Sequence, residues 1–470
     1  MGFPGEFISL LEEAIGKDGL MTALEGLGRE AAVSVRLNPF KTDERSLREN
    51  FLPVSAEKVE WCGDGFFLSE RPSFTLDPLY HGGAYYVQDS SAMFVGSLFA
   101  DALSSLVDSY GDRPLRVLDL CAAPGGKTTH LSSVLRSSLG ERFLLVSNEV
   151  MRQRASVLCQ NVALWGDPNV IVTNADPKDF AAFPSFFDVV VADVPCSGEG
   201  MFRKDPEALR QWSLDNVGMC AARQRRILAD MWPCLREGGL LVYSTCTFNS
   251  KENDGNVLWA ASGLGADIVS PEKDYNGVIR TRCGYSLIPG FVKGEGQYCA
   301  ILRKEESSSF NSSKEQPLST KEKRKSGKEP VSAAIPSSVR LSVCRPCSFR
   351  SKGDAFYAVP SEISPLAGFL SPLRPMMEGV AVGVVKGKDL VPDCDLATSL
   401  LLDPGAFPSV EVDKGTALSF LHGDAVRLPD APKGIIRLKY SGAGIGFVKN
   451  IGQRCNNLLP PSRRIRMDIR

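Results

Sequence analysis

The sequence predicts an α/β protein whose core is a Rossmann-like, mostly parallel sheet with helices on both faces. A small N-terminal α/β domain and a C-terminal β-rich region are expected to flank it. From residue 115 onward, apolar runs typical of buried strands alternate with segments typical of helices. Residues 305–330 are charged and Ser-rich with few large apolar side chains, which favours a flexible linker. Short β-prone segments punctuated by Gly and Pro follow the linker.

The length sets the number of domains. A chain of 470 residues, 43% of them hydrophobic, is long enough for about two or three domains with cores of their own. We expect an N-terminal domain at 1–110, a central domain at 111–304, a flexible linker at 305–335 and a C-terminal region at 336–470.

The N-terminal domain is expected to begin with an amphipathic helix at 7–27, followed by a strand within 32–41. Many aromatic residues come next. They would either seal a small core or, beside Arg36, contact nucleic acid.

The central domain shows the alternation most clearly. We expect its strands at 116–120, 143–147, 170–173, 187–192 and 240–244, with helices between them, for example at 127–137 and 151–165. Continuous apolar runs with helices between them are typical of a parallel sheet that is buried on both faces.

The C-terminal region carries several short strand signals, which favour a small β-rich barrel or sandwich. These signals lie at 338–343, 379–385, 408–412, 425–428, 434–440 and 444–449. The formal net charge of the whole chain is −1, yet residues 431–470 hold nine Lys or Arg against one acid. Such a basic end suits either a polyanionic partner or a solvated surface.

The thirteen cysteines are scattered, as is usual for reduced thiols of cytoplasmic proteins. Cys344 and Cys347 form a lone CxxC, and the later Cys394 and Cys455 stand singly, so no zinc site is expected. We find no N-terminal leader pattern and no run of about 18 apolar residues. The expected location is therefore the cytoplasm, without a membrane anchor.

Two cysteines stand just past predicted strands of the central sheet. Cys196 follows the run FDVVVADVP, and Cys246 follows GGLLVYST. The carboxyl ends of parallel strands meet at one edge of a sheet, so both thiols are expected in one crevice. They would be catalytic nucleophiles, buried core thiols or a redox pair, although a redox pair would lack CxxC spacing.

The loop Cys121–Lys127 (CAAPGGK) follows the first central strand. Its small residues and glycines would let a ligand approach the backbone at the start of the next helix. A P-loop needs a glycine where Cys121 stands, and GxGxxG is absent, so a nucleotide triphosphate or a dinucleotide is not favoured.

An acidic residue lies at or near the carboxyl end of each of four predicted strands: Asp119, Glu149, Asp176 and Asp193. An acid after the second strand is how such folds hold a ribose. Four acids around one crevice suit a cationic nucleoside such as S-adenosylmethionine better than an anionic dinucleotide.

Several motifs resemble the Nop/Sun family of RNA cytosine-5 methyltransferases, most closely its bacterial RsmF-like branch, which acts on small-subunit ribosomal RNA. The motifs are RLNPFK, YYVQDSSAM, LDLCAAPGGKT, DVPCSGEGMFRKDP, YSTCTFNSKEN and RCGYSLIPGFVKGEGQYCAIL. The resemblance spans about 30–304. The end of the chain resembles the PUA-like RNA-binding module of the same proteins.

The resemblance implies a class I methyltransferase core and an S-adenosylmethionine site. The residues implied to bind this cofactor are Cys121, Ala122, Ala123, Pro124, Gly125, Gly126, Lys127, Glu149, Asp176 and Asp193. It also implies that Cys246 is the nucleophile that adds to carbon 6 of cytosine and that Cys196 assists product release. Asp193 is implied to bind the target base.

The implied partner is RNA, either ribosomal RNA or the small ribosomal subunit, with the protein a monomer. Basic residues expected to contact RNA are Arg36, Arg203, Lys204, Lys449, Arg463 and Arg464. For Arg210, Arg223, Arg225 and Arg226, phosphate contacts and an ordinary exposed helix face are equally compatible with the sequence.

Three rival functions stay open. A tRNA cytosine-5 methyltransferase would use the same chemistry. A DNA cytosine-5 methyltransferase would use the Pro-Cys thiol as its nucleophile and would not need the Thr-Cys partner. A non-catalytic RNA-binding assembly factor would be expected to lose a cysteine or the ligand loop, and this sequence has lost neither.

Overall fold

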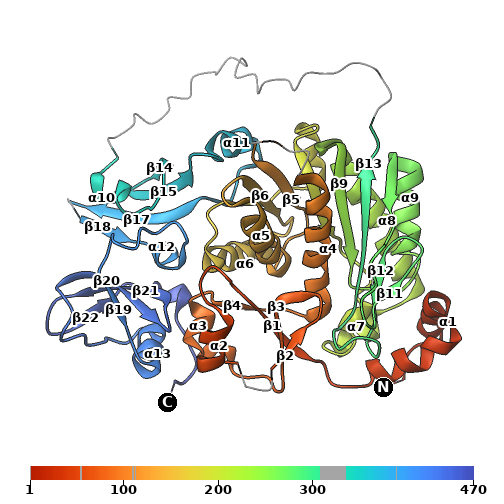
Figure 1. The fold of residues 1–470 in the computed structure, drawn as a ribbon, viewed down its shortest axis with the longest axis horizontal. Helices are drawn as coiled ribbons and strands as arrows, with labels where there is room; N and C mark the ends of the chain where they lie inside the picture. Colours follow the sequence, from red (N-terminus) through yellow and green to blue (C-terminus); the bar gives the residue numbers. More distant parts are fainter. Residues whose placement is uncertain are drawn as a thin grey trace.

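The computed structural model describes residues 2–52, 56–107, 111, 113–306, 335–387 and 389–469. Figure 1 shows the N-terminal sheet below the central sheet, with the C-terminal sheets on the left. Most of the predicted linker, 307–334, lies outside the described residues. None of the helices in the described ranges is long and apolar enough to cross a membrane.

The N-terminal part begins with the predicted helix, here α1 (Gly5–Leu27). A four-stranded antiparallel sheet follows in the order β2-β3-β1-β4. Its strands are β1 (Val33–Leu37), β2 (Glu57–Val59), β3 (Cys62–Leu68) and β4 (Tyr85–Val87), with helices α2 (Glu44–Asn50) and α3 (Pro78–His81). Asp43 caps α2 by accepting a hydrogen bond from the Ser46 N–H.

The central sheet contains five parallel strands in the order β9-β8-β5-β6-β7. They are β5 (Leu115–Asp119), β6 (Phe143–Asn148), β7 (Val170–Thr173), β8 (Phe187–Asp193) and β9 (Leu235–Thr245), each within a few residues of its predicted place. Antiparallel strands extend the sheet beyond β9: β10 (Ala266–Val269), β11 (Ile279–Arg280), β12 (Tyr285–Leu287) and β13 (Gln297–Lys304).

Helices cover both faces of this sheet, as predicted. One face packs against α4 (Ser90–Val107), α5 (Gly126–Leu139) and α6 (Arg152–Trp165), through side chains such as Phe99, Leu131 and Leu158. The other face packs against α8 (Leu214–Met231) and α9 (Asp254–Leu264). We expected residues 90–107 in the N-terminal domain, but α4 packs on the central sheet because its apolar side is buried there.

The C-terminal region differs from the single small barrel or sandwich that we predicted, since it forms two separate four-stranded sheets. The first contains β14 (Cys347–Lys352), β15 (Ala355–Pro360), β17 (Val380–Lys386) and β18 (Asp389–Pro392). The second contains β19 (Ser409–Glu411), β20 (Gly434–Tyr440), β21 (Ala443–Asn450) and β22 (Cys455–Asn457). Short helices α10 (Ser337–Arg340), α11 (Ser364–Phe369), α12 (Cys394–Thr398) and α13 (Lys414–His422) accompany them.

Two strand predictions in this region are wrong. In the described segment 338–343, helix α10 and a turn stand where we expected a strand, and only Val343 makes a β-bridge, to Leu402. In 425–428, Val426 makes a single bridge to Cys455. Both segments are apolar because single side chains such as Val339 and Val426 enter a core, which does not require a paired strand.

A further short strand ties the C-terminal region to the central domain. β16 (Met377–Glu378) pairs antiparallel with β7 and so extends the free edge of the central sheet. Ile363, Ala367 and Leu370 are buried in the same core as α8 and α9. The C-terminal region is therefore docked on the central domain through both backbone pairing and apolar burial.

Candidate active site

The first part of the site is the loop between β5 and α5. Gly125 lies at the N-cap of α5 with φ of 112°, a left-handed conformation that favours glycine. The Ala122 N–H donates to the Asn148 carbonyl oxygen, which holds the loop against the end of β6. The loop therefore presents small residues at the start of a helix, as the sequence predicts.

Four acidic residues stand at the carboxyl ends of adjacent strands, in the sheet order Asp193 (β8), Asp119 (β5), Glu149 (β6) and Asp176 (β7). Burial and the nearby charges of Asp193, Asp119 and Glu149 raise the pKa of the Cys121 thiol. The charges of three of the four acids therefore act on this one thiol. Asp176 also has a local role, because it forms a capping box with Asp179 at the 3-10 helix η2 (Pro177–Ala182).

Asp119 is the most deeply buried of these acids. Its Oδ2 accepts a hydrogen bond from Thr128 Oγ1 at 2.6 Å, and its Oδ1 has no hydrogen-bond partner among the described residues. Burial, together with the charge of Asp193, raises the pKa of Asp119 to about 7. A cationic ligand would compensate this buried carboxyl group.

The raised pKa of Asp119 predicts how stability depends on pH. Between pH values of about 4 and about 7, the folded protein keeps a proton on Asp119 that the unfolded chain has released, so stability is lost as pH rises through this window. Asp119→Asn does not titrate. We therefore expect the free energy of unfolding of the variant, relative to that of wild type, to rise by about 3 kcal/mol between about pH 5 and about pH 8.

Urea unfolding of both proteins without added ligand measures this difference. The exposed helix residue Asp215 gives a control, since Asp215→Asn should follow the wild-type pH dependence. Parallel pH profiles of Asp119→Asn and wild type would contradict the prediction.

The second part of the site is the pair of cysteines. Cys196 and Cys246 lie 50 positions apart in the sequence, yet their Sγ atoms are 3.0 Å apart. The Gly200 N–H donates to the Cys246 carbonyl oxygen at 2.9 Å, which joins the loops that follow β8 and β9. The predicted convergence of the two thiols at one edge of the sheet is confirmed.

The two thiols interact strongly. The hydrogen bond with Cys246, then burial and the charges of Cys246, Glu252 and Asp193, raise the pKa of Cys196 well above its ordinary value. Either sulfur can donate the hydrogen bond that joins them. The two sulfurs are therefore close enough to exchange a proton.

Asp193 lies between the ligand loop and the cysteines. Its Oδ2 accepts a hydrogen bond from Lys127 Nζ at 2.9 Å, and its Oδ1 accepts from Ser244 Oγ at 2.8 Å and Gln297 Nε2 at 3.0 Å. Burial by itself lowers the pKa of Lys127, but the charge and hydrogen bond of Asp193 raise that pKa overall. Lys127 is thus held as a cation at the centre of the site.

Sequence reasoning missed a set of buried polar side chains beneath the two cysteine loops. Glu199 accepts hydrogen bonds from the N–H groups of Phe248 and Asn249, and from the side chains of Asn249 and Trp212. Glu252 accepts from the Ser197 N–H at 3.0 Å and from Gln224 Nε2 at 2.7 Å. The only signal in the sequence was the presence of acids inside the motifs SGEG and NSKEN.

Asn148 was also missed. Its side chain donates to the carbonyl oxygens of Leu120 and Ala175, and accepts from Thr173 Oγ1 at 2.8 Å. One amide therefore fixes the ends of β5, β6 and β7 relative to one another.

Two of the predicted RNA contacts are not supported by the structure. Arg36 is 1% exposed, and its guanidinium donates to Gln88 Oε1 and Thr129 Oγ1. The side chain of Arg203 is 5% exposed and pairs with Glu295 at 2.8 Å. Both guanidinium groups are used inside the protein, Arg36 between the N-terminal sheet and α5, and Arg203 below the cysteine loops.

The other predicted RNA contacts are accessible. Lys204 and Lys449 are exposed, and Arg464 is half-buried. Arg463 is half-buried too and pairs with Asp395 at 2.8 Å. Of the basic residues left open, Arg210, Arg223 and Arg226 are exposed, whereas Arg225 donates to Asn256 Oδ1.

Three family models match the chain. Residues 111–302 match 16S rRNA methyltransferase RsmB/F. Residues 3–90 match the N-terminal domain of 16S rRNA methyltransferase RsmF, and 407–465 match the methyltransferase RsmF PUA domain. The matches follow the order of the N-terminal sheet, the central sheet and the second C-terminal sheet.

A curated relative is ribosomal RNA small subunit methyltransferase F of Escherichia coli O1:K1, which is 36% identical over 270 residues. The match covers 55% of this chain and 53% of the relative, so the chain spans about half the length of that protein.

Two solved structures share the fold. A methyltransferase homologue from Pyrococcus horikoshii has a TM-score of 0.53 and 24% identity, covering 64% of this chain and 96% of that one. NSun6 from Pyrococcus horikoshii with SFG has a TM-score of 0.53 and 18% identity, covering 65% and 99%. The two solved structures show the fold alone. The matched family models place the central domain of this chain in the RsmB/F family of methyltransferases, flanked by the N-terminal and PUA domains of RsmF.

Proposed function

We propose that this protein is an S-adenosylmethionine-dependent RNA (cytosine-5) methyltransferase that acts on small-subunit ribosomal RNA. The observation that carries the proposal is the 3.0 Å separation of Cys196 and Cys246 Sγ, beside the Lys127–Asp193 pair. The family models and the curated relative support ribosomal RNA of the small subunit as the substrate. The protein would work in the cytoplasm as a monomer, without a metal ion.

The residues at this edge of the sheet fit S-adenosylmethionine on chemical grounds. The unpaired buried Asp119 Oδ1 and the carboxyl groups of Asp193 and Glu149 suit a ligand with ammonium and sulfonium groups. Glu149, after the second parallel strand, would hold the ribose. The segment Cys121–Lys127 would contact the ligand through its backbone, and Asp176 would lie beside the adenine. When bound, S-adenosylmethionine would supply the electrophilic methyl group.

The protein's own task is to make carbon 5 of cytosine nucleophilic. The Cys246 thiolate adds to carbon 6, and the electron pair displaced from the ring double bond makes carbon 5 able to attack the methyl group. Asp193 binds the polar edge of the base and favours the protonated ring that accepts the thiolate.

Release requires loss of the proton on carbon 5. Its electron pair restores the double bond between carbons 5 and 6, and the Cys246 thiolate leaves. Cys196, whose sulfur lies next to that of Cys246, assists this step directly or through water. The target base must be unstacked to reach the thiols, so the RNA is single-stranded or locally opened there.

Covalent trapping tests the proposal. Purified wild type, Cys196→Ala and Cys246→Ala are incubated with small ribosomal subunits and S-adenosylmethionine, and denaturing gels report any protein–RNA adduct. We expect an adduct only with Cys196→Ala, because addition by Cys246 proceeds while release stalls.

The other outcomes separate the rival functions. An adduct that forms only with Cys246→Ala would reverse the roles of the thiols and favour the DNA-type chemistry. If Cys196→Ala forms an adduct with tRNA and not with the ribosomal subunit, the substrate is tRNA. If wild type transfers no methyl group to either RNA and no variant forms an adduct, the non-catalytic assembly factor is favoured.

A further inference from the structure

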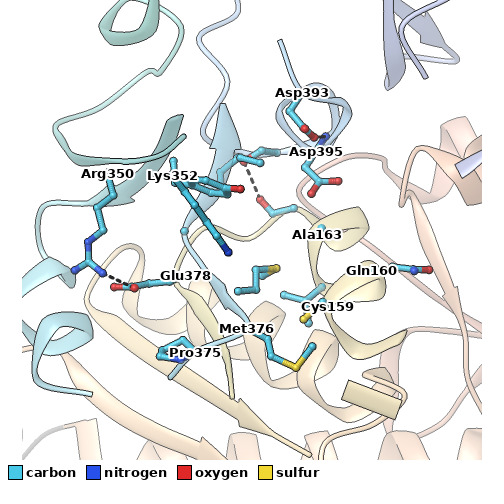
Figure 2. Close-up of a pocket in the computed structure, with 18 of the residues that line it drawn as sticks. Cys159, Gln160, Ala163, Arg350, Lys352, Pro375, Met376, Glu378, Asp393 and Asp395 are labelled. Atoms are coloured by element: carbon cyan, nitrogen blue, oxygen red, sulfur yellow. Dashed lines mark hydrogen bonds and ion pairs between the residues drawn. The ribbon is translucent and has the colours of Figure 1, made fainter. Parts of the chain in front are cut away.

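A cavity lies away from the cysteines, between the central domain and the first C-terminal sheet (Figure 2). Its volume is about 640 Å³, within the range of small-ligand sites. The α6 side is formed by residues such as Cys159 and Ala163, and the other side by β14, β15 and the segment before β17. None of the three family models covers 335–387, which supplies much of this other side.

Most of the charges that line the cavity are already paired. Arg350 pairs with Glu378, and Arg463 pairs with Asp395. Asp167 pairs with Arg136 at 2.7 Å. Lys352 is not paired, since no hydrogen bond or ion pair to another described residue is found for its exposed ammonium group. Figure 2 shows the Lys352 side chain pointing into the cavity.

The carboxyl groups at the far side belong to Asp393 and Asp395 (Figure 2). Together with Cys394 they offer oxygen and sulfur atoms within 4.8 Å of one another. Asp393 Oδ1 accepts the Asp395 N–H at the start of α12, and Asp395 pairs with Arg463, so helix capping and an ion pair explain the cluster without a metal. The Cys394 thiol also hydrogen-bonds to the Asp393 carboxylate, which still has lone pairs for a further hydrogen-bond donor.

Part of the remaining lining is apolar. Met376 is 37% exposed although it lies at the cavity, Met377 follows it, and Tyr357 is half-buried on the opposite strand. Methionine thioethers and aromatic rings pack well against the faces of planar rings. The cavity thus combines a free cation, a carboxylate acceptor and surfaces suited to a planar group.

Helix α6 links this cavity to the proposed active site. The helix begins just after Glu149 and carries Arg154, which pairs with Glu149 at 3.2 Å. Ala163, nine residues further along the same helix, lines the cavity. At 1.5 Å per residue the two points are about 14 Å apart along the helix, a distance that a short stretch of RNA can span.

We propose that this cavity binds one unstacked nucleotide of the RNA substrate. Its phosphate lies at Lys352, its base packs against Met376, Met377 and Tyr357, and an exocyclic amino group of the base donates to Asp393. The inference rests on the proposed function in one respect, that the substrate is RNA.

The test uses the full chain and adenosine 5′-monophosphate as the probe, with S-adenosylhomocysteine present to block the cofactor crevice. Ligand-observed NMR titrations compare wild type with Lys352→Glu, which reverses the unpaired charge on an exposed side chain. Lys386→Glu, at an exposed position on β17 that does not line the cavity, is the matched control. We expect at least about tenfold weaker binding to Lys352→Glu and unchanged binding to Lys386→Glu.

Three further measurements test the proposed contacts one at a time. Met376→Trp should also weaken binding, because the larger side chain fills the space for the base. Uridine 5′-monophosphate should bind wild type more weakly than the adenosine nucleotide, because uracil has no exocyclic amino group. For a ribosomal RNA fragment, Lys352→Glu should reduce the salt dependence of binding by about one phosphate contact.

The outcomes of this test are separable from those of the proposed function. If Lys352→Glu and Lys386→Glu both bind the nucleotide and the RNA as wild type does, the cavity is not a nucleotide site, whether or not methyl transfer occurs. If wild type transfers no methyl group and still binds the nucleotide more tightly than Lys352→Glu does, the proposed function fails and the nucleotide site stands.

Discussion

Replacing Asp193 by asparagine is expected to lower the rate of methyl transfer by about 10³-fold while the protein stays folded. The carboxylate accepts from Lys127 on one oxygen and from Ser244 and Gln297 on the other. Asparagine keeps the shape of the side chain. In the proposed mechanism, asparagine lacks the charge that favours a protonated cytosine ring, and in one orientation it turns an N–H toward the Lys127 ammonium group.

Single-turnover transfer of labelled methyl groups to ribosomal RNA measures this loss, and circular dichroism checks the fold. Ser244→Ala is the matched control because it removes one hydrogen bond to the same carboxylate but leaves its charge. We expect the control to retain activity within about tenfold of wild type. An Asp193→Asn enzyme as fast as wild type would exclude the carboxylate from the reaction.

Glu199→Ala is expected to destabilise the protein by about 3–5 kcal/mol. Glu199 is 1% exposed and accepts four hydrogen bonds from residues of two different segments. Alanine would leave the buried N–H groups of Phe248, Asn249 and Trp212 without an acceptor. Since Phe248 and Asn249 closely follow Cys246, the loop that carries this thiol should also lose its fixed position.

Urea unfolding gives the change in stability, and adduct formation in the Cys196→Ala background reports the position of Cys246. Glu207→Ala is a suitable control, because Glu207 lies on the surface helix α7 (Pro206–Gln211) in an exposed pair with Arg210. Removing that pair should change stability by less than about 0.5 kcal/mol. A Glu199→Ala protein within about 1 kcal/mol of wild type, with normal adduct formation, would show that the cysteine loops are held by other contacts.

The same two residues illustrate what a sequence reveals about a site. Asp193 ends an apolar run that could only be a buried strand, so its place at the edge of the sheet followed from periodicity. Glu199 stands in a Gly-rich turn, and nothing local distinguishes a buried acceptor from an exposed acid there. Its role depends on partners at Trp212 and Phe248, which reach it only through the fold.

The basic residues also show that a local sequence pattern does not identify the partners of a side chain. We predicted RNA contacts for Arg36 and Arg203 from their charge and their neighbours in the sequence. In the structure, each guanidinium group donates instead to buried acceptors from distant segments. A guanidinium group binds the acceptors that the tertiary structure places nearby, and the neighbouring sequence does not identify those acceptors.

The sequence by itself determined the alternation of strands and helices from Leu115 to Thr245, the small-residue loop after β5 and the delivery of both thiols to one edge of the sheet. It could do so because backbone hydrogen bonding and burial impose short periods that are legible within a few residues. Only the tertiary structure decided the 3.0 Å contact between the thiols, the burial of Arg36 and the docking of β16 on β7. These depend on packing between segments far apart in the chain, whose geometry is fixed by side-chain contacts that no local pattern encodes.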